Sequence, residues 1–68
     1  MRLTVNGKPR EVEGPLTIQE FLQAHNLNPM LVAVEYNDEI IRRESFGGVQ
    51  LNEGDKLEII HMVGGGTS

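Results

Sequence analysis

The sequence predicts a small α+β domain, with a mixed sheet of four to five strands and one main helix packed on one face. Three observations predict this class. Residues 1–5 alternate apolar and polar side chains, as a half-buried strand does, and residues 56–63 form a strand pattern with Leu57, Ile59 and His61 on one face. One amphipathic helical segment follows the first strand pair, and turn residues separate the remaining apolar runs. With 68 residues, the chain has room for one domain and a modest core.

The first two strands are predicted to form a hairpin. Residues 1–5 make the first strand, and Asn6-Gly7 is a strong turn signal because both central residues of a type I′ turn need a positive φ. Lys8-Pro9 is expected to widen this turn before the chain returns as a strand over residues 10–12.

A helix is predicted directly after the hairpin. Thr17 is a good N-cap, and Glu20 stands three residues later, which completes a capping box. Asn26 is able to adopt the left-handed conformation that ends a helix, and Pro29 prevents the helix from resuming. One helical face carries Ile18, Phe21, Leu22 and His25.

The second half of the chain is predicted to add three strands. Residues 31–34 form a short apolar run that suits a strand covered on both faces. A turn at Asn37-Asp38 leads to a short strand at 39–41, and residues 45–49 are expected to be irregular. After a turn at 53–55, residues 56–63 form the last strand.

This order of elements is the β-grasp arrangement, in which a hairpin and later strands form one sheet with a crossing helix. We expect the domain to span residues 1–63 and residues 64–68 to be a flexible, glycine-rich tail. The expected core consists of Leu3, Val5, Val12, Ile18, Phe21, Leu22, Val32, Val34, Leu57 and Ile59.

Composition and charge exclude several kinds of function. Without cysteine, the chain cannot form a disulfide, a cysteine nucleophile or a thiolate metal site. The net charge is −4, and the one adjacent basic pair, Arg42-Arg43, stands next to Glu44, so no nucleic-acid partner is expected. No apolar run approaches the roughly 20 residues that span a bilayer. We therefore expect a cytoplasmic protein without a membrane partner.

Metal binding is also not expected. His25 and His61 lie far apart in the sequence, each on a mostly apolar face, which favours structural or surface histidines over zinc ligands. Glu35, Asp38 and Glu39 cluster near a turn, but they lack the spacing of a calcium loop and are interpreted as a solvated acidic turn. No catalytic residue is identified.

Three stretches together resemble the ThiS family, the sulfur carrier proteins of thiamine biosynthesis, from Met1 to Gly66. They are Leu3-Thr4-Val5-Asn6-Gly7; the helix followed by Val32-Ala33-Val34-Glu35-Tyr36-Asn37-Asp38-Glu39-Ile40-Ile41-Arg42-Arg43; and the Gly54-Asp55 turn with the last strand and the glycine tail. The order, the length and the ending carry the resemblance, and they imply a ubiquitin-like β-grasp fold.

The resemblance implies a protein co-substrate and not an enzyme. Gly65 and Gly66 match the family's terminal diglycine, whose carboxylate is adenylated and then converted to a thiocarboxylate. The implied partners are a ThiF-like adenylating enzyme of the ubiquitin-activating type, which consumes ATP, and a ThiG-like thiazole synthase. The carrier itself would bind no cofactor and no metal.

The tail departs from the family pattern, because Thr67 and Ser68 follow Gly66. Three explanations stay open: a protease removes the two residues, the pair is a cloning remnant, or the protein is a divergent relative. Glycine suits a segment that must enter a partner's active site, because it has no side chain. At about 3.3–3.6 Å per residue, residues 63–66 reach roughly 13 Å beyond the domain.

Docking to partners is assigned to the end of the last strand. Ile60 and Met62 are predicted to point outward beside the tail, and with Val63 and Gly64 they form the candidate docking residues. Two alternatives to the thiamine carrier remain. One is a sulfur carrier for molybdopterin, cysteine or tRNA thiolation, and the other is a β-grasp interaction module with an inert tail.

Overall fold

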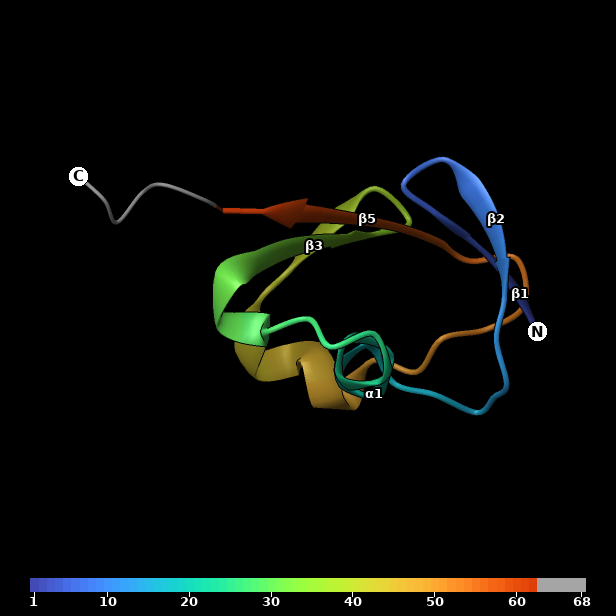
Figure 1. Cartoon of the computed structure of the whole chain (residues 1–68), viewed down its shortest axis with the longest axis horizontal. Helices are drawn as coiled ribbons and strands as arrows, with labels where there is room; N and C mark the ends of the chain where they lie inside the picture. The colour runs from blue at the N-terminus through green and yellow to red at the C-terminus, as the bar shows by residue number, and fades with distance from the viewer. Residues whose placement is uncertain (63–68) are drawn as a thin grey trace.

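The computed structural model describes residues 1–62 as a five-stranded sheet with α1 and the 3-10 turn η2 below it in the view of Figure 1. In chain order the elements are β1 (Arg2–Val5), β2 (Lys8–Glu11), α1 (Ile18–Ala24), η1 (Pro29–Leu31), β3 (Val32–Tyr36), β4 (Glu39–Ile41), η2 (Arg43–Gly48) and β5 (Lys56–His61). The strand order is β2-β1-β5-β3-β4, with β1 parallel to β5 and all other neighbours antiparallel. The predicted α+β, β-grasp architecture is confirmed.

The hairpin of β1 and β2 turns on two residues. Asn6 has a φ of 52° and Gly7 a φ of 80°, so the predicted turn is confirmed. Lys8 lies directly opposite Val5, and β2 therefore begins at Lys8. The prediction that Lys8-Pro9 widens the turn is wrong. Two residues suffice because the twist of a type I′ turn matches the twist of the strands it joins.

The ends of α1 follow from its sequence. Thr17 Oγ1 accepts a hydrogen bond of 3.1 Å from the Glu20 backbone, and Glu20 Oε1 accepts one of 2.9 Å from the Thr17 backbone. The predicted capping box is thus confirmed. Asn26 has a φ of 59° and ends the helix, also as predicted. Pro29 was predicted only to keep the helix from resuming. In the structure it also begins the 3-10 turn η1.

The prediction that residues 31–34 form a strand covered on both faces is wrong. Leu31 belongs to η1 and is 53% exposed, and β3 begins only at Val32. Val32 and Val34 are buried, whereas Ala33 between them is half-exposed. One face of β3 is covered and the other is not, because the helical layer lies on one side of the sheet only (Figure 1).

The core contains two residues that the sequence pattern missed. Phe46 and Leu51 are 2% and 1% exposed, although residues 45–49 were expected to be irregular. The 3-10 turn η2 places Phe46 in the core, and the Leu51 backbone N–H donates to the Leu16 carbonyl at 2.8 Å. Val12 and Ile59, predicted as core, are only partly buried against it. The buried apolar residues are Leu3, Val5, Ile18, Phe21, Leu22, Val32, Val34, Phe46, Leu51 and Leu57.

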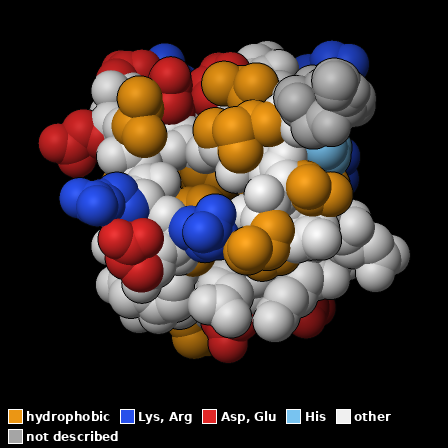
Figure 2. Space-filling model, turned by 90° about the vertical axis from the view of Figure 1, so that its left-hand side faces the viewer, with side chains coloured by type: hydrophobic (Ala, Val, Ile, Leu, Met, Phe, Trp, Pro, Cys, Tyr) orange, Lys and Arg blue, Asp and Glu red, His pale blue; other side chains and the backbone are white. Residues whose placement is uncertain are grey.

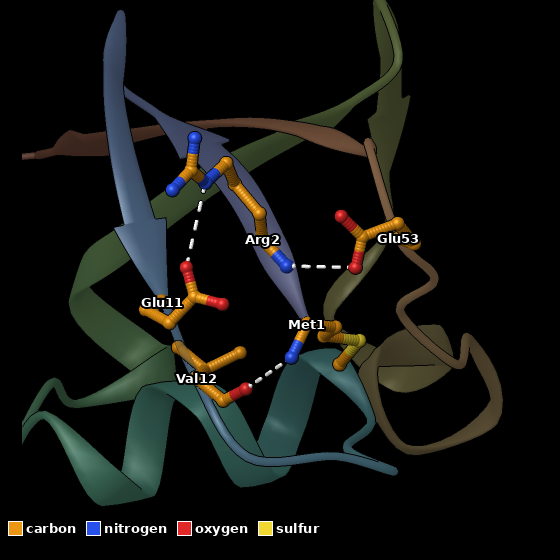
Figure 3. Close-up of polar contacts among 5 residues, drawn as sticks. All are labelled: Met1, Arg2, Glu11, Val12 and Glu53. Atoms are coloured by element: carbon orange, nitrogen blue, oxygen red, sulfur yellow. Dashed lines mark hydrogen bonds and ion pairs between the residues drawn. The ribbon is translucent and has the colours of Figure 1, made fainter.

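Polar contacts tie β1 to the chain segments on both sides of it (Figure 3). The Met1 ammonium donates to the Val12 carbonyl at 2.7 Å, and the Arg2 backbone N–H donates to Glu53 Oε1 at 2.9 Å. Arg2 Nε lies 3.4 Å from Glu11 Oε1. The Glu53 contact fixes the loop that leads into β5, and so it sets where β5 starts beside β1.

Candidate functional site

The strand that carries the candidate site, β5, lies in the centre of the sheet between β1 and β3. Leu57 has partners on both sides, Val5 of β1 and Tyr36 of β3. Because β1 ends at Val5, the last residues of β5 pair on the β3 side alone within residues 1–62. The strand itself ends at His61, shorter than the predicted 56–63. Its final residues therefore combine a fixed backbone position with an accessible edge.

The outward side chains at the end of β5 are apolar. Ile60 is 50% exposed and Met62 is 52% exposed, as the alternation of the sequence predicts. Leu31 joins them, because the Met62 backbone N–H donates to the Leu31 carbonyl at 2.9 Å and Leu31 is 53% exposed. We call Leu31, Ile60 and Met62 the apolar end surface. Sequence reasoning missed Leu31 because it was assigned to a covered strand, although Asn28-Pro29 is a signal for a turn.

Figure 2 shows the end of the molecule at which β5 finishes. Hydrophobic side chains gather on this end, with basic and acidic side chains among them. Met30, in η1, is 59% exposed and adds to the apolar character next to Leu31. Exposed apolar side chains that gather on one face, with charged groups among them, are typical of a protein–protein interaction surface.

The outer face of the sheet next to this surface is acidic. Glu58 lies directly opposite Glu35 across β5 and β3, two positions before Ile60 along the strand. Lys56 Nζ contacts Asp38 Oδ1 at 2.9 Å, and this contact raises the pKa of Lys56 above its ordinary value, with a smaller contribution from both glutamates. Like charges directly across a strand pair destabilise it, and the nearby Lys56 ammonium offsets part of this repulsion. A partner with basic side chains would relieve the repulsion.

The remaining predicted site residues, Val63, Gly64, Gly65 and Gly66, lie outside the described residues. The same is true of Thr67-Ser68 and of the predicted tail over residues 64–68. The strand residues described here are those that directly precede them in the chain.

The structure brings together two histidines that the sequence left separate. His25 at the end of α1 and His61 at the end of β5 line the same pocket. Within residues 1–62, no three histidine, aspartate or glutamate side chains lie close enough to hold a metal ion. None of the helices in this part of the chain has the length and apolar character that crossing a membrane requires.

Comparison with known proteins relates the whole domain to one family. The sequence model of the ThiS family matches residues 3–66, which includes Gly65 and Gly66. The sulfur carrier protein ThiS of Bacillus subtilis is 46% identical over 50 residues, which cover 74% of this chain and 76% of that protein. The crystal structure of the thiamine biosynthesis protein ThiS from Geobacter metallireducens superposes with a TM-score of 0.84 at 40% identity, over 97% of this chain and 100% of that one.

A second kind of relative is much longer. A thiazole synthase of Paramagnetospirillum magneticum is 39% identical over 67 residues, which cover 98% of this chain but 21% of that protein. The chain thus spans about a fifth of the length of this relative, and the same holds for the thiazole synthase of Magnetococcus marinus. The matched family and the structural likeness agree on a ubiquitin-like β-grasp domain, and the chain belongs to the ThiS family.

Proposed function

We propose that this chain is a sulfur carrier of thiamine biosynthesis, a protein co-substrate whose Gly66 carboxyl group carries the sulfur. What supports the proposal is that the family match reaches through Gly65-Gly66, which follow in the chain after β5, a strand in the centre of the sheet. The chain binds no cofactor of its own, because a ThiF-like adenylating enzyme consumes the ATP and a ThiG-like thiazole synthase accepts the sulfur. We place this activity in the cytoplasm, where ATP is available.

The chemistry proceeds through activation of a weak electrophile. The Gly66 carboxylate attacks the α-phosphate of ATP and displaces pyrophosphate, which leaves an acyl adenylate. The terminal sulfur of a persulfide then attacks the acyl carbon and AMP leaves. A thiol reduces the resulting acyl disulfide, so that one sulfur stays on Gly66 as a thiocarboxylate. Every group that promotes these steps belongs to the partners.

Thr67-Ser68 follow Gly66 in the sequence, so the Gly66 carboxyl group of the chain as written is part of a peptide bond. The test compares two versions of the chain, one as written and one that ends at Gly66. Each is incubated with a ThiF-like enzyme, ATP and a persulfide donor, and then analysed by intact mass spectrometry. We expect the mass gain of one oxygen replaced by one sulfur in the version that ends at Gly66, and in that version alone.

A failure of both versions to gain sulfur would contradict the proposal and favour the interaction module. Equal loading of both versions would contradict the role of the Gly66 carboxylate. If sulfur is loaded, transfer to a thiazole synthase in a reconstituted reaction identifies the acceptor. Loading without transfer to this acceptor would favour a carrier for molybdopterin, cysteine or tRNA thiolation.

We further propose that the apolar end surface docks the chain on these partners. Two features support this: Ile60 and Met62 are exposed shortly before the tail in the chain, and the adjacent Glu35–Glu58 pair suits a basic partner surface. Ordering a tail costs entropy on binding, so the domain must contribute affinity.

The docking test uses two identical substitutions. Ile60→Asp is expected to weaken binding to the adenylating enzyme at least about tenfold, because it places a charge in the apolar centre of an interface. Ile40→Asp is the control for a carboxylate placed outside the apolar end surface, because Ile40 is 74% exposed on the edge strand β4, opposite Glu35. Binding constants from calorimetry distinguish the two. Equal effects of both variants would contradict the assignment of the surface.

A further inference from the structure

A pocket of about 150 Å³ lies on the helix side of the sheet. It is bounded by the β1–β2 hairpin, the end of α1 and the end of β5, and its lining residues are Val5, Asn6, Arg10, Phe21, His25, Leu27, Ile59 and His61. The pocket exists because β1 ends at Val5 while β5 continues to His61, so the last helix-facing side chains of β5 have no β1 neighbour.

The lining of the pocket combines apolar side chains with the nitrogen groups of Asn6, Arg10, His25 and His61. Val5, Phe21, Leu27 and Ile59 supply the apolar walls. Arg10 lies opposite Leu3 in the hairpin register, so its side chain is on the helix side of the sheet together with the buried Leu3. Ligand sites in proteins have this composition, an apolar interior with a few placed polar groups.

Two contacts fix the imidazole of His25 beside Arg10. Its ring stacks on Phe21, with centroids 4.2 Å apart and an interplanar angle of 27°. Nδ1 lies 2.9 Å from the Phe21 carbonyl oxygen, and since a carbonyl only accepts, Nδ1 carries the hydrogen. Because a guanidinium only donates, Nε2 is the acceptor of the 3.5 Å contact with Arg10 Nη1. This long contact uses one of the five N–H donors of the guanidinium.

The charge of Arg10 is not neutralised within residues 1–62. Arg2, Arg42 and Lys56 each lie within 4.0 Å of a carboxylate, whereas no ion pair of the described residues involves Arg10. None of the residues that line the pocket is acidic. In a chain with a net charge of −4, this pocket is therefore a local positive site with unused donors.

We propose that this pocket binds a small organic anion, a carboxylate or phosphate group on a compact apolar body. The volume matches the body, since a cavity of about 150 Å³ holds a molecule the size of benzene. The Arg10 guanidinium binds the anion through two parallel N–H donors, which is the geometry arginine offers to carboxylates and phosphates. Val5, Leu27 and Ile59 surround the apolar body.

The anion site is independent of the proposed sulfur chemistry. Ile60 and Met62 alternate with Ile59 and His61 along the strand, so the apolar end surface and the pocket lie on opposite faces of the sheet. An anion in the pocket contacts the strand that leads to the tail without covering the proposed docking residues. The two proposals can therefore fail separately.

The test is a titration followed by amide signals in two-dimensional NMR. Benzoate and phenyl phosphate are the probes, benzyl alcohol is the neutral analogue, and inorganic phosphate has the charge without the apolar body. We expect saturable shifts at Asn6, Phe21 and Ile59 with benzoate or phenyl phosphate, and the stronger of the two identifies the preferred head group. Benzyl alcohol and inorganic phosphate should bind at least about tenfold more weakly, since each lacks one half of the interaction.

The matched variants are Arg10→Gln and Arg43→Gln. Both remove one exposed positive charge, but Arg43 lies in η2 and does not line the pocket. Arg10→Gln is expected to weaken binding about tenfold or more, and Arg43→Gln to leave it within twofold. Unchanged amide dispersion shows that each variant folds. No saturable shift at the pocket, or equal binding by both variants, would overturn the proposal.

Discussion

The Tyr36 hydroxyl donates a hydrogen bond of 2.6 Å to Asp55 Oδ2, which joins the end of β3 to the start of β5. Partial burial by itself would raise the pKa of Asp55. The hydrogen bonds from Tyr36, the Asn52 backbone and Asn37 outweigh it and hold the pKa below its usual range. The same bond to Asp55 raises the pKa of Tyr36.

These shifts make stability depend on pH at both ends of the scale. The folded pKa of Asp55 lies below the unfolded one, so its contribution is fully present above about pH 4 and is lost as the pH falls further. The folded pKa of Tyr36 lies above the unfolded one, so its contribution is fully present below about pH 10 and is lost as the pH rises. Tyr36→Phe should cost about 1 kcal/mol at neutral pH, as measured by urea unfolding.

The control for this prediction is a double-mutant cycle. In an Asp55→Asn background, Tyr36→Phe should no longer change the acid limb of the stability profile, because the carboxylate is gone. An equal effect of Tyr36→Phe in both backgrounds would show that the loss comes from packing and not from the hydrogen bond.

Phe46 should be as important to stability as the helix residue Phe21. The ring is 2% exposed, so Phe46→Ala is expected to lower the free energy of unfolding by roughly 3–5 kcal/mol. Because that loss could unfold so small a domain, Phe46→Leu serves as a milder variant. Ile40→Ala is the exposed control and should change stability little. Thermal unfolding measures the stability of all three variants. Stabilities of Phe46→Leu and Phe46→Ala close to that of the unchanged chain would contradict the burial of the ring.

Alanine substitutions at two glycines distinguish the effect of backbone strain from that of steric crowding. A Cβ atom at either Gly7 or Gly48 would meet no atom within 4 Å, but Gly7 alone has a positive φ, of 80°. Gly7→Ala should therefore destabilise by about 1–2 kcal/mol, and Gly48→Ala should not destabilise. Chemical denaturation of the pair measures the difference. Equal stabilities would mean that the hairpin relaxes to another turn.

Gly66→Ala, in the version of the chain that ends at residue 66, should slow sulfur loading without changing thermal stability. The added methyl group lies next to the acyl carbon, which must enter the active site of the adenylating enzyme. The rate of thiocarboxylate formation by mass spectrometry measures the effect. Loading at the unchanged rate would show that the partner's channel accommodates a side chain.

The parts of the fold that the sequence predicted are those that local chemistry determines. The capping box of Thr17 and Glu20 needs only residues three apart, and the positive φ values at Asn6-Gly7 and Asn37-Asp38 are intrinsic preferences of those residues. Phe46 and Leu51 could not be found in this way. Their burial depends on contacts between distant segments, such as the bond from the Ile18 N–H to the Val49 carbonyl at 3.0 Å.

The same division holds for the candidate site. Strand alternation sufficed to place Ile60 and Met62 outside. Three other features depend on strand register and on where β1 ends. They are the position of Leu31 beside Met62, the pairing of Glu35 with Glu58, and the pocket that His25 and His61 share. No periodicity in the sequence encodes these relations between elements.

The central place of β5 also has a mechanical consequence. A pull on the chain beyond Met62 acts along the length of this strand, and its hydrogen bonds to β1 and β3 share that load in shear. A strand at the sheet edge, pulled sideways, would instead release its bonds one after another. The domain is therefore expected to stay folded when an enzyme applies force to the end of the chain that follows β5.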